Sequence, residues 1–320
     1  MLMDNLFFQD PKDHNEFTVF QDEAGCKVSN YFYHGFLFID NRFGREILDS
    51  LINIKKDEGN RYTEVHFVYI KASSNEEYGY KTRIALKWLN LASEWLVNRK
   101  LRFYVLGINK NNLGNFWNNN WRYEKNIYLR FFELGLKASI SWFGNDKKLV
   151  KPLRASHLFY EYGKYNDDRR DKVIWLSKFN FGNLLTNQNI QSIFSDEKKQ
   201  QKQNSLLSEF SNLDQLTDLM LGVSKYSFIK VNPKHVGKQE CIDRFIDIIE
   251  KFNNQKIAFN TNDGFYKNFS FSFFPKNRIN KKDFLKKNTN YYIKSKDNFY
   301  CDRLTYRQQL AKNQNLTFNF

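Results

Sequence analysis

The pattern of apolar and polar positions divides the chain into strand-like and helix-like segments. Residues 16–23 and 30–39 have strand character, and a short polar loop containing Gly25 joins them, which predicts a hairpin. Residues 42–56 and 80–98 carry apolar side chains at helical spacing, which predicts two helices.

The rest of the chain continues this alternation. Further segments with strand character are 63–70, 101–108, 153–161 and 189–195. Further segments with helical character are 122–143, 168–185, 212–226 and 239–252. Helices alternating with strands predict an α/β fold. Because Phe-rich and Lys-rich stretches dominate after residue 230, we expect a core domain over residues 1–229 and a C-terminal extension over residues 230–320, whose role the sequence does not indicate.

The composition is that of a globular chain. The 320 residues are 41% hydrophobic and 18% aromatic with only 4 prolines, so a sizeable core is expected. No uncharged apolar run is long enough to span a bilayer, and the first residues are too acidic for a signal peptide, so we expect a cytoplasmic protein. Cys26, Cys241 and Cys301 are widely spaced without a His cluster, which predicts free thiols and no zinc site.

The charge favours an anionic partner. A net charge of +15 predicts contact with nucleic acid, through phosphate neutralisation and counterion release. A genome rich in adenine and thymine would also raise the Lys, Asn, Phe, Tyr and Ile counts together, so both explanations stay open. Basic runs at 147–154, 198–202 and 276–282 either follow a phosphate backbone or are solvated faces.

The end of the first predicted strand carries the sequence Asp22-Glu23-Ala24-Gly25. Two carboxylates at a strand end can hold a divalent metal ion. An acidic residue shortly before a glycine is also ordinary turn chemistry, so the tetrapeptide by itself leaves both interpretations open.

Three segments in order along the chain resemble a known family. They are Asp22 to Gly25, the triplet Glu64-Val65-His66 at the start of a later predicted strand, and the helical segment 213–222 with sequence LDQLTDLMLG. Together they are similar to the family called domain of unknown function 3800, over about residues 16–226. The resemblance implies a ribonuclease H-like mixed sheet flanked by helices, with an Mg²⁺- or Mn²⁺-dependent nuclease activity and a mobile-element or phage-defence context.

The resemblance also implies roles for single residues. Asp22 and Glu23 match the acids that end the first strand, and Asp218 matches the acid of the C-terminal helix. Glu64 corresponds to the Glu of a Glu-x-Lys-like element. Glu161, at the end of the predicted strand 153–161, is the candidate for the middle acid, with Asp167 and Asp168 as alternatives. The expected catalytic residues are therefore Asp22, Glu64, Glu161 and Asp218.

The chain departs from the family pattern at a few positions. Ala24 stands where Ser is frequent, His66 where Lys is frequent, and Thr217 where a small residue is usual. Asp214 lies one helical turn before Asp218, and either side chain can reach a metal ion. The expected metal ligands are Asp22, Glu23, Asp214 and Asp218.

Each candidate also has an ordinary structural interpretation. On a helical wheel Asp214 and Asp218 lie opposite the apolar face, so the pattern alone makes Asp218 a solvated surface acid. Glu64 and Glu161 resemble acids that keep strand edges soluble. His66, within a predicted strand, fits a core histidine with satisfied hydrogen bonds.

The leading hypothesis is hydrolysis of phosphodiester bonds in DNA or RNA by two magnesium ions. The alternatives are a non-catalytic nucleic-acid-binding protein, with Tyr and Trp side chains stacking on bases, and a protein that acts through a protein partner. The absence of a Gly-x-x-x-x-Gly-Lys-Ser/Thr loop argues against a nucleotide-triphosphate motor.

Overall fold

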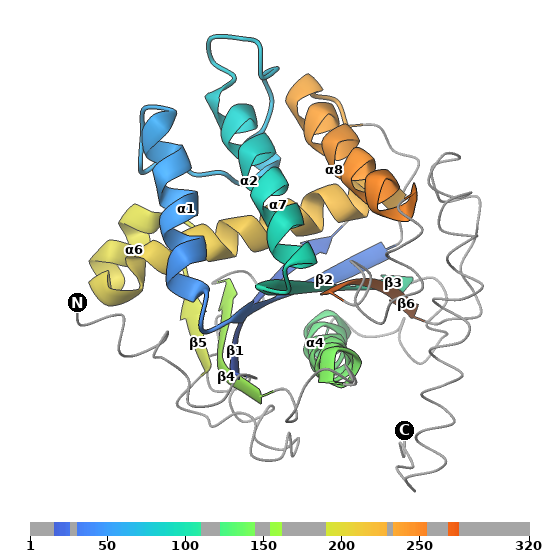
Figure 1. The fold of residues 1–320 in the computed structure, drawn as a ribbon. Helices are drawn as coiled ribbons and strands as arrows, with labels where there is room; N and C mark the ends of the chain where they lie inside the picture. Colours follow the sequence, from blue (N-terminus) through green and yellow to red (C-terminus); the bar gives the residue numbers. More distant parts are fainter. Residues whose placement is uncertain are drawn as a thin grey trace, which may run out of the picture.

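The fold is a mixed six-stranded sheet with helices on both faces (Figure 1). The structure is a computed structural model, and it describes residues 16–25, 31–109, 122–144, 154–161, 190–228, 233–254 and 268–274. The strand order is β5-β4-β1-β2-β3-β6. None of the helices within these ranges is long and apolar enough to cross a membrane.

The strand that carries Asp22 and Glu23 lies inside the sheet, with a neighbour on each side. The strands are β1 (Glu16–Gly25), β2 (Tyr31–Asp40), β3 (Leu101–Asn109), β4 (Arg154–Glu161), β5 (Ile190–Ile193) and β6 (Phe269–Phe274). Strands β1, β2 and β3 pair antiparallel, whereas β4 pairs parallel with β1, β5 with β4, and β6 with β3. The predicted hairpin and the strands predicted at 101–108, 153–161 and 189–195 are confirmed.

The helices form a thick layer on one face and a thin one on the other. The helices are α1 (Gly44–Asp57), α2 (Tyr80–Val97), α4 (Arg122–Gly144), α6 (Glu197–Gln203), α7 (Ser211–Phe228) and α8 (Val236–Asn254), with the short helices η1 (Phe67–Tyr69) and η5 (Ser205–Phe210). Figure 1 shows α1, α2, α7 and α8 on one face of the sheet and α4 on the other. Of the predicted helices, 168–185 lies outside the described residues, as do Asp167 and Asp168, and the other five are confirmed.

Alternation along β1 divides the core into two layers. Phe20 packs in the layer under α7, where its ring stacks on Phe159 of β4 with centroids 5.1 Å apart. Phe17 and Val19 point the other way and pack in the layer under α4 with Phe132. Because side chains alternate along a strand, residue 22 is directed to the α7 side and residue 23 to the α4 side.

The strand predicted over residues 63–70 is wrong. That segment is irregular except for η1, because side chains of α7 take its backbone donors in place of a neighbouring strand. The backbone N–H of Val65 donates to Oε1 of Gln215 at 2.9 Å, and that of Phe67 donates to Oδ2 of Asp218 at 2.6 Å. The apolar alternation at 63–70 therefore reflects packing against a helix.

The described part of the C-terminal segment packs on this same core. Helix α8 contacts α2 and α7, and β6 extends the sheet beyond β3. The rings of Phe245 on α8 and Phe269 on β6 are 5.6 Å apart at their centroids. Cys241 on α8 is a buried free thiol, in agreement with the expectation for that residue.

Candidate functional site

Asp22 is buried near the end of β1 and faces α7. Only 2% of the residue is exposed. Its Oδ1 accepts the backbone N–H of Glu23 at 2.7 Å, whereas Oδ2 has no hydrogen-bond donor among the residues that the structure describes. A buried carboxylate oxygen without a donor is costly, so it calls for a proton or a cation.

Helix α7 brings two further carboxylates to the same place. Asp214 is 1% exposed, and its Oδ1 likewise finds no hydrogen-bond donor within the described ranges. The side chain of Asp218 is 17% exposed, so the interpretation of Asp218 as a solvated surface acid is wrong. The helical wheel misleads here because α7 lies between the sheet and α8, and both of its faces are covered.

His66 is the basic partner of this cluster. Its Nδ1 lies 2.8 Å from Oδ2 of Asp218, and its Nε2 lies 3.5 Å from Oε1 of Glu161. Burial lowers the pKa of His66, but the charge and hydrogen bond of Asp218, the hydrogen bond of Glu161 and the charge of Asp22 outweigh burial and raise the pKa to about 12. His66 is therefore an imidazolium that bridges two acids, which the interpretation as an ordinary core histidine missed.

Glu161 ends β4 beside Asp22 and His66. Its side chain is 26% exposed, and its Oε1 accepts the hydroxyl of Ser195 at 3.0 Å. The negative charge of Glu161 raises the pKa of both Asp22 and Asp214. The structure thus places this candidate for the middle acid with the other carboxylates. Ser195 had no signal in the sequence, because its place depends on the turn after β5.

Burial and repulsion among these acids act together. The pKa of Asp22 is raised well above its usual value by burial first, and then by the charges of Asp218 and Glu161. Burial and Glu161 raise the pKa of Asp214 in the same way, against the influence of His66. Asp218 is the exception: although burial raises its pKa, the ion pair with His66 lowers it overall, helped by the backbone N–H of Phe67. Asp22 and Asp214 therefore favour their neutral forms, whereas Asp218 is held as a carboxylate by His66.

Two expected site residues lie elsewhere. Glu23 points to the α4 side, where its Oε2 accepts the hydroxyl of Tyr128 at 3.1 Å. It therefore does not share a face of the sheet with Asp22, and this geometry does not favour the expectation that Glu23 is a metal ligand beside Asp22. Glu64 lies in the irregular segment before η1, and its charge acts on buried Lys55. The residue of that triplet that contacts Asp218 is His66.

The donor set suits a divalent cation in its chemistry. No group of three or more His, Cys, Asp or Glu side chains in the described part of the chain is arranged as a ready-made metal site. Burial and mutual repulsion nevertheless raise the pKa of Asp22 and Asp214, and a bound cation would reverse this effect by stabilising the carboxylate forms, whose oxygens lack donors. Mg²⁺ and Mn²⁺ prefer such oxygen ligands. Asp22, Asp214 and Asp218 are the residues that would hold the ion.

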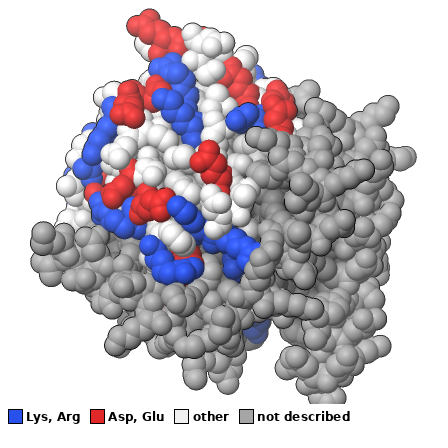
Figure 2. Space-filling view, viewed as in Figure 1, with Lys and Arg blue, Asp and Glu red and all other residues white. Residues whose placement is uncertain are grey.

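Basic side chains lie next to the acids. Nζ of Lys225 on α7 donates to the carbonyl oxygen of Gly25 at 3.0 Å. Nζ of Lys238 on α8 lies 5.4 Å from the centroid of the Phe67 ring. Burial lowers the pKa of Lys238, and the charge of Asp218 opposes this shift. On the face of the molecule drawn in Figure 2, Lys and Arg are interspersed with Asp and Glu, so the described part of that face is not one uniform basic patch.

Comparison with known proteins does not assign this site to a family. No family model matches the chain, and no curated protein matches it. The resemblance to domain of unknown function 3800 therefore stays a prediction.

Proposed function

We propose that the protein is a metal-dependent nuclease that hydrolyses phosphodiester bonds of DNA or RNA on a ribonuclease H-like fold. The observation that carries the proposal is the buried Asp22 carboxylate, with one oxygen lacking a donor, facing acids from β4 and α7. Acids from distant segments that meet in space are what a cation-dependent phosphodiesterase requires. A central hairpin with an acid on its first strand also agrees with the fold that the family resemblance implies.

Each side chain of the cluster has a part in this proposal. A bound Mg²⁺ or Mn²⁺ would lower the pKa of the attacking water and stabilise the charge on the leaving oxygen. Asp22, Asp214 and Asp218 would hold the cation. His66 holds Asp218 in place and, with the hydroxyl of Ser195, orients Glu161.

Replacing Asp22 tests the function directly. We expect Asp22→Asn to keep the fold and to lose about 100-fold or more of the cleavage rate, the scale on which loss of one charged active-site contact acts. The measurement is cleavage of labelled single- and double-stranded DNA and RNA with Mg²⁺, with Mn²⁺ and with EDTA. Glu23→Gln is the matched control, since the neighbouring carboxylate faces Tyr128 on the other side of the sheet and its loss should leave cleavage nearly unchanged.

A folded Asp22→Asn protein that cleaves as fast as the parent would contradict the nuclease assignment. So would a parent protein whose cleavage is the same in EDTA as in Mg²⁺.

A non-catalytic nucleic-acid-binding protein is the second candidate, and one surface feature favours it. Tyr69 is 48% exposed, its ring centroid lies 5.7 Å from that of His66, and Nζ of Lys81 lies 5.2 Å from its centroid. An exposed aromatic ring beside a cation suits base stacking with phosphate contact. Salt-sensitive binding without cleavage under any metal, lost in Tyr69→Ala but kept in Tyr69→Phe, would select this candidate. If neither DNA nor RNA binds at low salt, a role through a protein partner gains most.

A further inference from the structure

Behind the carboxylate cluster a buried amide connects three segments of the chain. Gln215 on α7 is 1% exposed. Its Oε1 accepts Nζ of Lys55 at 2.8 Å and the backbone N–H of Val65 at 2.9 Å. Its Nε2 donates to the carbonyl oxygen of Ser195. One side chain thus ties α1, the segment before η1 and the turn after β5 to α7.

The last two of these segments each deliver a group to the acids. Val65 directly precedes His66, which contacts Asp218 and Glu161. Ser195 donates its hydroxyl to Glu161. Gln215 follows Asp214 and precedes Asp218 on the same helix, so it fixes both segments relative to the acids of α7.

Lys55 and Val65 together determine the orientation of this amide. Lys55 is fully buried, and its Nζ contacts the same atom of Gln215 as the backbone N–H of Val65; because a backbone N–H can only donate, that atom must be the oxygen. With Oε1 fixed in this way, Nε2 is directed to the carbonyl oxygen of Ser195. The reversed amide would place two sets of donors against each other at Lys55 and two acceptors at Ser195.

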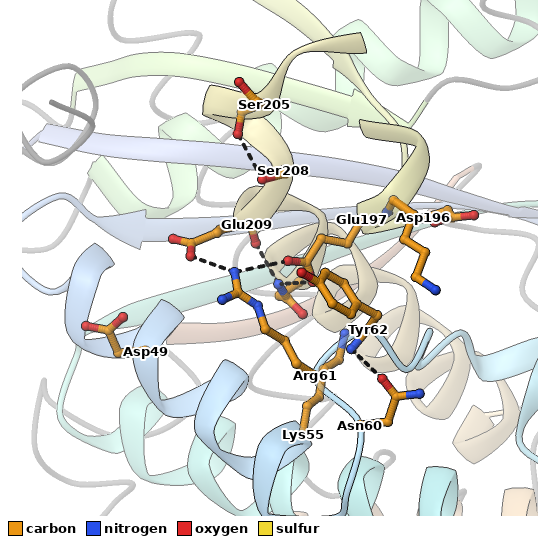
Figure 3. A network of polar contacts seen from close by, with 12 residues as sticks. Asp49, Lys55, Asn60, Arg61, Tyr62, Asp196, Glu197, Ser205, Ser208 and Glu209 are labelled. Carbon is orange, nitrogen blue, oxygen red and sulfur yellow. Dashed lines mark hydrogen bonds and ion pairs between the residues drawn. The ribbon is translucent and has the colours of Figure 1, made fainter. Parts of the chain in front are cut away.

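The surroundings hold Lys55 at this position. Its Nζ lies 5.2 Å over the ring of Trp88. Burial lowers its pKa to about 7, against the charges of Glu197 and Glu64, which raise it. Figure 3 shows the adjacent network, in which Arg61 pairs with Glu197 at 3.4 Å and with Glu209 at 2.9 Å. A buried amino group without a hydrogen-bond partner is costly, so the contact of Lys55 with the amide is a specific feature of this core.

We propose that Gln215, oriented by Lys55, is a positioning residue that holds His66 and Ser195, and through them Glu161, against the acids of α7. The positioning follows from the contacts alone, and its consequence for cleavage rests on the proposed function. Gln215 lies behind the cluster and donates to none of its carboxylates in the described structure.

The test compares Gln215→Met with Gln215→Glu. The Met variant removes the amide at similar size, and we expect the backbone N–H groups of Val65 and Phe67 to exchange with deuterium about tenfold faster, as for one lost hydrogen bond. We expect Mn²⁺ alone to bind about 10- to 100-fold more weakly, the usual effect of losing a residue that orients ligands. Any cleavage should lose kcat with KM nearly unchanged. The Glu variant keeps an acceptor for Lys55 and Val65, so the exchange of Val65 should return toward that of the parent.

Asn268→Leu is the matched control, because Asn268 is another fully buried amide, whose Nδ2 donates to the carbonyl oxygen of Leu96 at 2.7 Å away from the acids. If Gln215→Met does not fold, Lys55→Met replaces it, with faster exchange at Val65 as the expected result. Exchange and Mn²⁺ binding no different from those of Asn268→Leu would overturn the proposal.

The result also separates this inference from the proposed function. A parent that does not cleave, combined with faster exchange and weaker Mn²⁺ binding in Gln215→Met, would keep the positioning role and remove the nuclease. If the parent cleaves and Gln215→Met is unchanged in deuterium exchange, Mn²⁺ binding and kcat, the nuclease function is kept and the positioning role is removed.

Discussion

Two aspartates of the site have pKa values shifted in opposite directions because their surroundings differ. Asp22 and Asp218 are both acids near the same imidazolium, yet the pKa of Asp22 is raised and that of Asp218 is lowered. The difference arises because Asp218 has the ion pair with His66 and the backbone N–H of Phe67, whereas Asp22 has one oxygen without a donor. A pair of acids with separated pKa values is a common feature of catalytic sites.

Lys55 gives the stability a defined pH dependence. Its pKa is about 7 in the folded protein against 10.5 for an ordinary lysine, so between these values the unfolded chain binds more protons. We therefore expect the free energy of unfolding contributed by Lys55 to rise with pH across this window. His66, whose raised pKa acts in the opposite sense over this range, is present in both proteins, so chemical denaturation at several pH values should show the free energy of unfolding of the parent rising relative to that of Lys55→Met. Parallel pH profiles for the two proteins would mean that Lys55 keeps an ordinary pKa.

At the scale of elements, α7 connects the site to the core. One side of it packs on β1 and β2 and another on α8, and its polar residues face the segment before η1. Gly222 allows the closest approach, since a Cβ there would lie 2.4 Å from Cγ of Phe67. Phe67 in turn supplies the backbone N–H that Asp218 accepts, so helix packing and site geometry are linked at this position.

Adding a methyl group to α7 should therefore disturb both stability and the site. We expect Gly222→Ala to lower the free energy of unfolding by about 1–3 kcal/mol, as overpacking does, and to weaken Mn²⁺ binding by displacing Phe67. Gly135→Ala is the control, because a Cβ at Gly135 on α4 would meet Phe36 at 2.5 Å on the opposite face of the sheet. Urea denaturation and Mn²⁺ titration should show similar destabilisation in both variants and weaker binding in Gly222→Ala alone. Equal Mn²⁺ affinity in the two variants would show that the packing of α7 does not influence Mn²⁺ binding.

At the scale of the whole molecule, the described part of the C-terminal segment belongs to the same packed layers. Cys241, Ile242 and Phe245 of α8 are buried with residues of α2 and α7, and β6 pairs with β3. These contacts join residues on both sides of the expected boundary between residues 1–229 and 230–320.

A chain that ends at residue 229 should thus lose stability. Removing α8 and β6 exposes apolar surface of α2, α7 and β3, so we expect a lower urea midpoint or loss of cooperative unfolding. Phe245→Ala in the full chain should cost about 3–5 kcal/mol, the usual cost of truncating a buried Phe, and should still unfold in one transition. A shortened chain as stable as the full chain would instead support two separate domains.

Much of the fold could be predicted from the sequence, because local periodicity determines a helix or strand wherever one face is apolar. The β1–β2 hairpin, the α/β alternation and the bounds of α7 follow from that pattern. The candidates Asp22 and Asp218 also came from the sequence, Asp22 from its place at a strand end and Asp218 only through the family resemblance. What the pattern could not give is the burial of α7 on both sides.

By itself the sequence determined most of the helices and strands, among them β1, along which the alternation of side chains directs Asp22 and Glu23 to opposite faces. Only the tertiary structure decided that residues 63–70 pack as an irregular segment on α7, that His66 joins Asp218 and Glu161, and that Gln215 holds them from behind. The physical reason is that periodicity reports on bonds within one segment. These contacts instead join residues distant in sequence, and their formation depends on which backbone donors the neighbouring elements leave to be satisfied.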